Sequence, residues 1–190
     1  MLHVITNPCI YAALLAEIIQ ASKSGAISSP ISDSEAQQLH YLQATIREGL
    51  RVFPPLTTFM PKDAPPEGDT INGRHVPGGT QIGFAMFAMQ RQKHVFGNDA
   101  DIFRPERWLE ASPEARIEME KAQTLVFNGG KWTCLGKNVA FMELNKVFVE
   151  ILRRFDIAVV DPTRAWASIN WGVFINKGML VRITEREEKF

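Results

Sequence analysis

The sequence has the composition of one globular domain and carries no net charge. Its 190 residues, 45% of them hydrophobic and 22% charged, fit a single domain spanning residues 1–190. Lysine plus arginine number 21, as do aspartate plus glutamate, so the charge favours neither nucleic acid nor anionic lipid as a partner, and we expect no nucleic-acid binding. Two cysteines, Cys9 and Cys134, cannot build a disulfide framework and lie in no zinc-binding pattern, so we expect no disulfide partner.

The N-terminal twenty residues are apolar but interrupted. His3, Asn7, Pro8 and Glu17 break up the run and no basic leader precedes it, so we predict neither a signal peptide nor a membrane anchor. Asn7 has the character of a helix N-cap and Pro8 that of a first helical residue. We therefore predict a helix over residues 8–21, with residues 1–6 as the end of an earlier apolar element.

A loop, a helix and a small sheet are predicted for the next sixty residues. A serine-rich loop over residues 22–34 leads into a helix over residues 34–53, which Pro54 and Pro55 end. Residues 55–82 are dense in proline and glycine and contain Asn72-Gly73, a strong two-residue hairpin signal. This pattern predicts a small antiparallel sheet.

The remaining sequence predicts more helix, followed by strands. We expect a short helix within residues 83–97, a helix opened by Ser112-Pro113, and the longest helix over residues 135–155. "FDIAVVDP" reads as a strand and "WGVFINKGMLVRIT" as a hairpin that turns near residues 176–178. The predicted fold class is α+β, mainly helical, with small antiparallel sheets.

The stretch "FNGGKWTCLG" delivers Cys134 to the start of the predicted long helix. A thiol in the first helical turn faces free N–H groups and the positive end of the helix dipole, which favour the thiolate. Gly129, Gly130 and Gly136 leave room for a flat ligand, against which Phe127 can pack. Such a cysteine can be a nucleophile or a metal ligand, and the residues alone also fit a buried cysteine that acts as a small apolar side chain.

A second pattern pairs Glu48 with Arg51. Residues three apart on a helix are neighbours, and an exposed pair of this kind contributes about 0.2–0.5 kcal/mol, so the residues alone fit a solvated surface pair. Later in the chain "FRPERW" supplies a further arginine, Arg107. A carboxylate buried among these arginines would need full pairing.

Together these motifs resemble those of the cytochromes P450. The residues Phe127-x-x-Gly130-x-x-x-Cys134-x-Gly136 resemble the family's haem-binding signature. "EGLR" and "PERW" resemble its Glu-x-x-Arg and Pro-Glu-Arg-aromatic motifs, in the same order, and the wording of the cysteine motif is most similar to filamentous-fungal members. The chain departs from the pattern at Trp132, where the family usually has arginine.

The resemblance implies the C-terminal part of the cytochrome P450 fold, binding haem b. It implies that Cys134 is the axial ligand of the haem iron and that Phe127, Gly130 and Gly136 lie against the cofactor. Glu48, Arg51 and Arg107 would form a buried triad that holds the cysteine loop in place. With arginine absent at Trp132, we expect this tryptophan, Lys131 and Lys62 to bind the haem propionates.

The resemblance also implies a monooxygenase that inserts one oxygen atom into a lipophilic small molecule, in fungal secondary metabolism. The segments expected to line the substrate pocket contain Leu56, Thr57, Thr58, Phe59, Val173 and Phe174. NADPH-cytochrome P450 reductase would supply the electrons. The full-length relative would lie on the cytosolic face of the endoplasmic reticulum membrane, whereas this chain, with no predicted anchor, would be cytoplasmic.

Members of the family are considerably longer than this chain, and the missing part would precede Met1. We therefore expect a fragment, and expect that the isolated chain does not run the monooxygenation. One alternative is a truncated, inactive chain with no enzymatic role of its own. Another is a hydrolase with Cys134 as nucleophile and a histidine as base, the candidates being His3, His40, His75 and His94.

Overall fold

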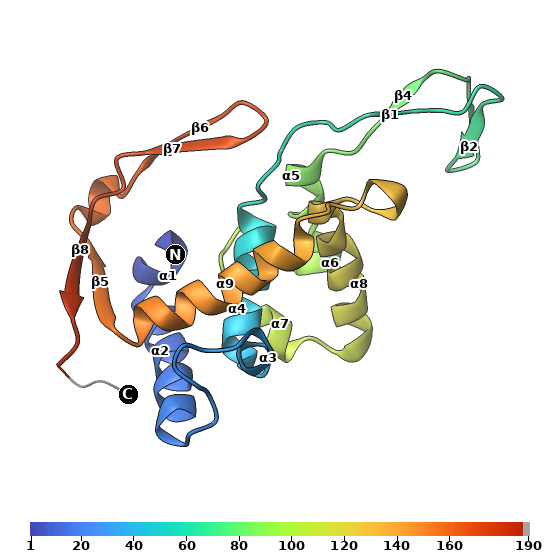
Figure 1. Cartoon of the computed structure of the whole chain (residues 1–190). Coiled ribbons are helices and arrows are strands. Elements are labelled where there is room, and N and C mark those ends of the chain that lie inside the picture. The colour runs from blue at the N-terminus through green and yellow to red at the C-terminus, as the bar shows by residue number, and fades with distance from the viewer. Residues whose placement is uncertain (188–190) are drawn as a thin grey trace.

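The computed structural model describes residues 1–187 and confirms a mainly helical α+β fold with small antiparallel sheets (Figure 1). The helices of this part of the chain are α1 (Leu2–Ile5), α2 (Pro8–Lys23), α3 (Asp33–Ala36), α4 (His40–Val52), α5 (Met86–Met89), α6 (Lys93–Phe96), α7 (Arg107–Glu110), α8 (Pro113–Thr124), η1 (Leu125–Phe127), η2 (Gly130–Trp132), α9 (Lys137–Leu152) and η3 (Pro162–Arg164). The strands are β1 (Lys62–Asp63), β2 (Asp69–Ile71), β3 (Arg74–Val76), β4 (Gln81–Ile82), β5 (Phe155–Val159), β6 (Ala167–Asn170), β7 (Phe174–Lys177) and β8 (Val181–Glu185). No helix in residues 1–187 has both the length and the apolar character required to cross a membrane.

Two helices begin at the caps that the sequence predicts. The side chain of Asn7 accepts a hydrogen bond from the N–H of Ile10 at 3.4 Å, and Pro8 is the first residue of α2. Ser112 accepts from the N–H of Ala115 at 3.2 Å at the start of α8. These side-chain oxygens replace the carbonyl partners that the first helical N–H groups lack.

The single helix predicted over residues 34–53 is wrong, because the chain forms α3 and α4 with a break at residues 37–39. Ser32 and Glu35 make a capping box that starts α3 inside the predicted serine-rich loop. At the break Leu39 is extended and its side chain is buried in the core. The Gln43 side chain donates to the carbonyl of Ala36 at 3.0 Å, which satisfies a polar group that the break exposes.

Two further helices are shorter than predicted. Residues 83–97 form α5 and α6 rather than one helix, and α9 ends at Leu152, so that Phe155 begins β5. At 16 residues α9 equals α2 in length. It starts late because the N–H of Cys134 donates to the carbonyl of Phe127 at 2.8 Å, which closes a loop ahead of the helix.

Strand pairing confirms one predicted hairpin and corrects another. β2 and β3 pair across Asn72-Gly73, both of which have positive φ, as this turn requires. The hairpin predicted over "WGVFINKGMLVRIT" is wrong, because β7 pairs with β6 and β8 pairs with β5. The chain turns instead at Trp171-Gly172, where Gly172 has a φ of +84°. The last strand, β8, therefore pairs with β5, which precedes the predicted hairpin, and Ile183 lies opposite Ile157.

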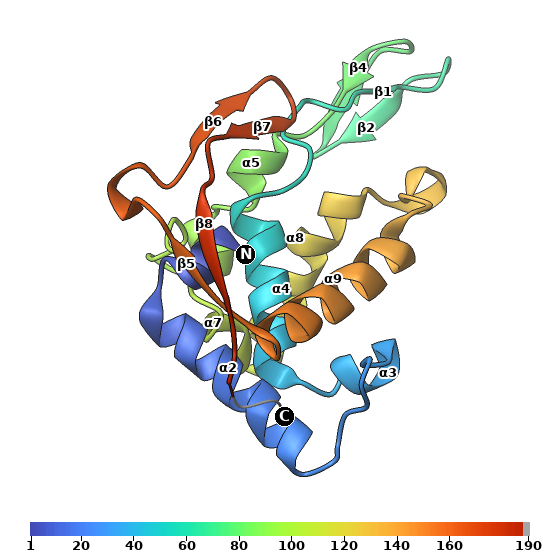
Figure 2. The same ribbon diagram turned by 60° about the vertical axis from the view of Figure 1, so that its left-hand side comes forward.

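The core forms around α4. Helices α2 and α9 pack on it from one side and α7 and α8 from the other, as Figures 1 and 2 show. Leu14, Ile18, Leu42, Val149 and Leu152 are buried on the first side, and Trp108 is buried on the second. Because α4 is covered on both sides, polar side chains of its middle turns are also buried.

Candidate functional site

The buried polar side chain at the centre of α4 is Glu48, which is 0% exposed, as is Arg51. Its carboxylate accepts from Nε and Nη2 of Arg51 at 2.9 and 2.8 Å and from Nε of Arg107 at 3.0 Å. It also accepts from the indole of Trp108 and the backbone N–H of Arg104, each at 2.9 Å. The interpretation of Glu48 and Arg51 as a solvated surface pair is therefore wrong.

The pKa of Glu48 results from two opposing effects. Burial alone raises the pKa, but the hydrogen bond and charge of Arg51, with smaller contributions from Arg104 and Arg107, outweigh burial and lower the pKa below its ordinary value. The carboxylate is thus ionised at neutral pH. The structure brings together the three residues of the predicted triad, and Asp99 adds a second carboxylate beside Arg107.

The remaining N–H groups of the two arginines donate to the irregular segment between α5 and α7. Their acceptors are the carbonyl oxygens of Gln90, Phe96, Asp99, Ala100 and Ile102. Arg107 also pairs with the carboxylate of Asp99 at 3.0 Å. Apart from the single turn of α6 this segment is irregular, so the arginines satisfy its buried carbonyl groups and fix its path.

Cys134 lies in the loop that joins η1 to α9 and contains η2, here called the cysteine loop (residues 128–136). Its side chain is exposed, so the interpretation as a buried apolar cysteine is wrong. It precedes the N-cap of α9, Gly136, and therefore lies outside the first helical turn in which the sequence placed it. A Cβ atom built on Gly129 or Gly130 would meet nothing within 4 Å, which leaves open space beside the loop.

Trp132 of the cysteine loop lies close to two lysines. The Nζ atoms of Lys62 and Lys131 lie 4.8 and 5.1 Å from the centre of its ring, within the range of cation–π attraction. Lys62 comes from β1, far away in the sequence, and Trp132 remains 55% exposed. The structure thus gathers an indole N–H and two ammonium groups, which suit an anion such as a carboxylate.

Comparison with known proteins identifies the family. The family model for cytochrome P450 matches residues 1–182. The chain belongs to the cytochrome P450 family. It is 44% identical over 187 residues to the cytochrome P450 monooxygenase ABA1 of Pyricularia oryzae and 42% identical to aba1 of Botryotinia fuckeliana, in both cases over 98% of this chain. It is 39% identical to the cytochrome P450 monooxygenase ACRTS1 of Alternaria alternata, of which it covers 49%.

The chain spans only 36% and 37% of the length of the first two relatives. These relatives are fungal, in agreement with the resemblance seen in the cysteine motif. Cytochromes P450 bind haem, so the family implies a haem cofactor here.

The cysteine loop fits such a cofactor. Cys134 offers an exposed sulfur, a soft donor suited to iron, and the open space at Gly129 and Gly130 lets a flat group approach. The cluster of Lys62, Lys131 and Trp132 offers donors for the two carboxylates that haem carries.

Phe127 directly precedes the cysteine loop, and Gly136 is its last residue. Phe127 is buried and packs on Phe141 of α9, with ring centres 5.3 Å apart, and its carbonyl accepts the N–H of Cys134. A Cβ atom on Gly136 would lie 3.9 Å from the sulfur of Cys134, an ordinary contact distance. Gly136 is therefore next to the sulfur, although a side chain there would not clash with it.

The segments expected to line the substrate pocket lie side by side. Leu56 forms an isolated antiparallel bridge with Val173, and the N–H of Thr57 donates to the carbonyl of Gly172 at 2.8 Å. Phe174 stacks on Phe53 with ring centres 3.8 Å apart. Thr58 and Phe59 continue the first of these segments. The two predicted segments thus form one partly exposed, mostly apolar surface.

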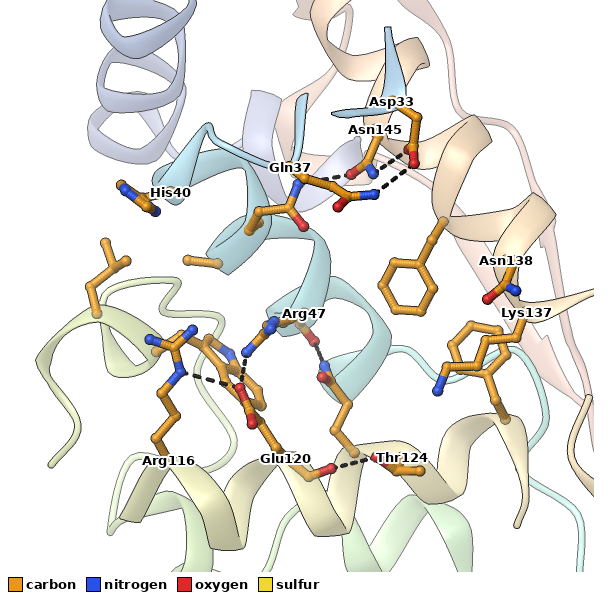
Figure 3. A pocket seen from close by; sticks show the side chains of 17 residues that line it. Asp33, Gln37, His40, Arg47, Arg116, Glu120, Thr124, Lys137, Asn138 and Asn145 are labelled. Atoms are coloured by element: carbon orange, nitrogen blue, oxygen red, sulfur yellow. Dashed lines mark hydrogen bonds and ion pairs between the residues drawn. The ribbon is translucent and has the colours of Figure 1, made fainter. Parts of the chain in front are cut away.

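A polar cavity of about 900 Å³ opens between α3, α4, α7, α8 and α9, and Phe127 and Lys137, which flank the cysteine loop, line one part of it (Figure 3). Arg47 and Arg116 both pair with Glu120 in its wall, and Asp33 accepts from Asn145 at 2.7 Å. Figure 3 shows these ion pairs and hydrogen bonds already made between the lining residues. Cys134 is not part of this lining.

The histidines predicted for a hydrolase lie in other surroundings. His3 stacks on Phe103 with ring centres 5.0 Å apart, and His40 lines the polar cavity. His75 belongs to β3, and its ring lies next to Gly68. Within residues 1–187 no hydrogen bond joins the sulfur of Cys134 to any of them or to His94.

Sequence reasoning missed several polar residues of the site. Trp108 and Asp99 complete the Glu48 cluster, and the aromatic position of "PERW" was a signal for the first of them. Gln90 and Gln123 are buried and hydrogen-bonded to neighbouring elements, but each lies where polar residues meet apolar ones along the chain, a position at which glutamine is ordinarily exposed. Only their tertiary surroundings distinguish them.

Proposed function

We propose that this chain carries the haem-thiolate site of a cytochrome P450 monooxygenase, with Cys134 as the axial ligand of haem b. The observation that carries the proposal is the exposed sulfur of Cys134 on a loop with open space beside it and a cationic cluster at Trp132. When bound, the haem supplies the oxygen chemistry by which one atom of O₂ enters an organic substrate.

The chain's own residues would hold the sulfur in position. The hydrogen bond from the N–H of Cys134 to Phe127 anchors the loop, and Phe127 is packed against α9. The N–H groups that follow Cys134 would donate to the thiolate and tune its electron donation. Glu48, Arg51 and Arg107 would be structural residues that hold this region in place, and their loss would prevent haem incorporation rather than alter selectivity.

Lys62, Lys131 and Trp132 would bind the haem propionates. An indole donates a single neutral hydrogen bond and lacks the charge of the arginine usual at this position, so the two lysines would supply the positive charge. The position of both ammonium groups within about 5 Å of the centre of the Trp132 ring supports this role. Gly130 would let the cofactor approach the backbone closely.

The substrate would be a lipophilic small molecule, and the reaction would belong to fungal secondary metabolism. The surface formed by Leu56, Thr57, Thr58, Phe59, Val173 and Phe174 would form one wall of its pocket. Electrons would come from NADPH-cytochrome P450 reductase. The complete protein would act on the cytosolic face of the endoplasmic reticulum membrane.

Reconstitution of the purified chain with haemin tests this assignment. The difference spectrum of the reduced carbon-monoxide complex should show a thiolate-type Soret band, and Cys134→Ser should abolish it. Cys9→Ser is the matched control, because Cys9 is also an exposed free cysteine and should leave the band unchanged. A chain without the band, or a band that survives Cys134→Ser, would support the inactive alternative or another ligand.

A further inference from the structure

The position of the cysteine loop depends on the last turn of α8. α8 ends at Thr124, η1 follows without a break, and the carbonyl of Phe127 at the end of η1 accepts the N–H of Cys134. Movement of the end of α8 would therefore move the anchor of Cys134. The last carbonyl groups of a helix have no partners within it, so this turn needs contacts from outside.

Gln90 supplies one such contact. It is 0% exposed, and its side-chain amide donates to the carbonyl of Ala122 in the last turn of α8 at 2.7 Å. Its own backbone carbonyl accepts from Nη1 of Arg51 at 2.7 Å. One residue thus connects the Glu48 cluster to the end of α8 through two short hydrogen bonds.

Gln123 supplies a second contact, in which the donor belongs to α8 and the acceptor to α4. It belongs to the same last turn of α8 and is buried, and its amide donates to the backbone carbonyl of Arg47, directly before Glu48 in α4. Both amides are neutral, so burial carries no charge penalty. Loss of either donor would leave a buried acceptor with one bond fewer, which favours local opening of this turn.

We propose that Gln90 and Gln123, here called the glutamine pair, are positioning residues that fix the last turn of α8 and thereby the sulfur of Cys134. The proposal rests on the proposed function for its consequence at the haem. Its structural part, fixation of the loop by two neutral amides, stands on the hydrogen bonds alone. The charged cluster around Glu48 then acts on the cysteine loop through Gln90.

Hydrogen–deuterium exchange on the purified chain tests the structural part. Gln90→Met and Gln123→Met remove the donors at similar volume, and each should speed exchange of a peptide covering residues 125–134 by about tenfold while a peptide from α2 keeps its rate. Ile18→Val is the matched control, because it weakens the core at α2 and removes no hydrogen bond to the last turn of α8. Unchanged exchange in both glutamine variants, or equal acceleration in Ile18→Val, overturns the proposal.

The spectrum of the haemin-reconstituted chain tests the consequence. The share of thiolate-type Soret band should fall several-fold in Gln90→Met and recover in Gln90→His, which retains an N–H donor. A full band in Gln90→Met overturns the positioning role. If the unchanged chain gives no thiolate band, the proposed function fails, and the exchange rates of residues 125–134 still decide whether the glutamine pair fixes the loop.

Discussion

At the scale of single residues, Glu48 is the buried charge that connects α4 to α7 and to the segment before it. Its carboxylate pairs with two buried guanidinium groups, and those groups in turn fix the carbonyl groups of the segment between α5 and α7. Removal of one partner from a buried ion cluster leaves the others uncompensated. A neutral side chain at this position is therefore more harmful than loss of a surface pair.

Glu48→Gln should lower the free energy of unfolding by about 3–5 kcal/mol, because Arg51 loses its carboxylate and Arg107 retains only Asp99. Urea unfolding followed by circular dichroism measures this loss. Glu143→Gln, an exposed change on α9, should stay within about 0.5 kcal/mol of the unchanged chain. Equal effects of the two substitutions would contradict the buried cluster.

The lowered pKa of Glu48 predicts how stability depends on pH. Burial raises this pKa, but Arg51 and its neighbours lower it by a larger amount, so the pKa in the folded state lies below the ordinary 4.5. The stabilisation is complete above the ordinary value and is lost as pH falls through the folded pKa. Free energies of unfolding measured between pH 7 and pH 3 should decline more steeply in the unchanged chain than in Glu48→Gln. Parallel curves would show that other carboxylates, such as Asp99, carry the acid sensitivity.

At the scale of elements, the cap of α2 makes a local contribution that can be measured separately. Asn7→Ala removes the acceptor for the N–H of Ile10 and should cost about 1 kcal/mol of stability in thermal or urea unfolding. Asn7→Asp retains an acceptor oxygen and adds a negative charge at the positive end of the helix, so it should match or exceed the unchanged chain. An equal loss in both variants would mean that the cap bond does not contribute.

The elements that sequence reasoning predicted correctly depend on local chemistry. Asn7, Ser112 and the turn at Asn72-Gly73 act within four residues of themselves, so their signals are complete in the sequence. The break between α3 and α4 depends on Leu39 reaching the core, and the partner of β8 is β5 rather than β7. Both are decided by tertiary packing, which a local pattern does not contain.

The same division applies to the site. Glu48, Arg51, Arg107 and Cys134 were found because their order along the chain matches a family pattern, and no periodicity distinguishes a buried Glu48 from an exposed one. Lys62 approaches Trp132 only through the path of β1. Gln90 lies where an apolar run (residues 84–89) meets a polar one (residues 91–94), and nothing in this local sequence shows that its side chain is buried.

At the scale of the whole molecule, α9 carries an exposed apolar surface. Leu135, Val139, Met142 and Val147 are exposed on or just before this helix. A groove of about 760 Å³ follows the same helix, and Leu50 and Pro55 contribute to its wall. Contiguous apolar surface of this kind is rare on monomeric soluble proteins and favours association.

The isolated chain should therefore self-associate in a concentration-dependent way through α9. The double substitution Met142→Glu and Val147→Glu places two like charges in the apolar groove and should shift the sedimentation velocity distribution toward the monomer. Ile117→Glu adds a charge at an exposed apolar residue of α8, away from the groove, and should leave the distribution almost unchanged. If Ile117→Glu disperses the chain as effectively, net charge rather than the surface of α9 controls association.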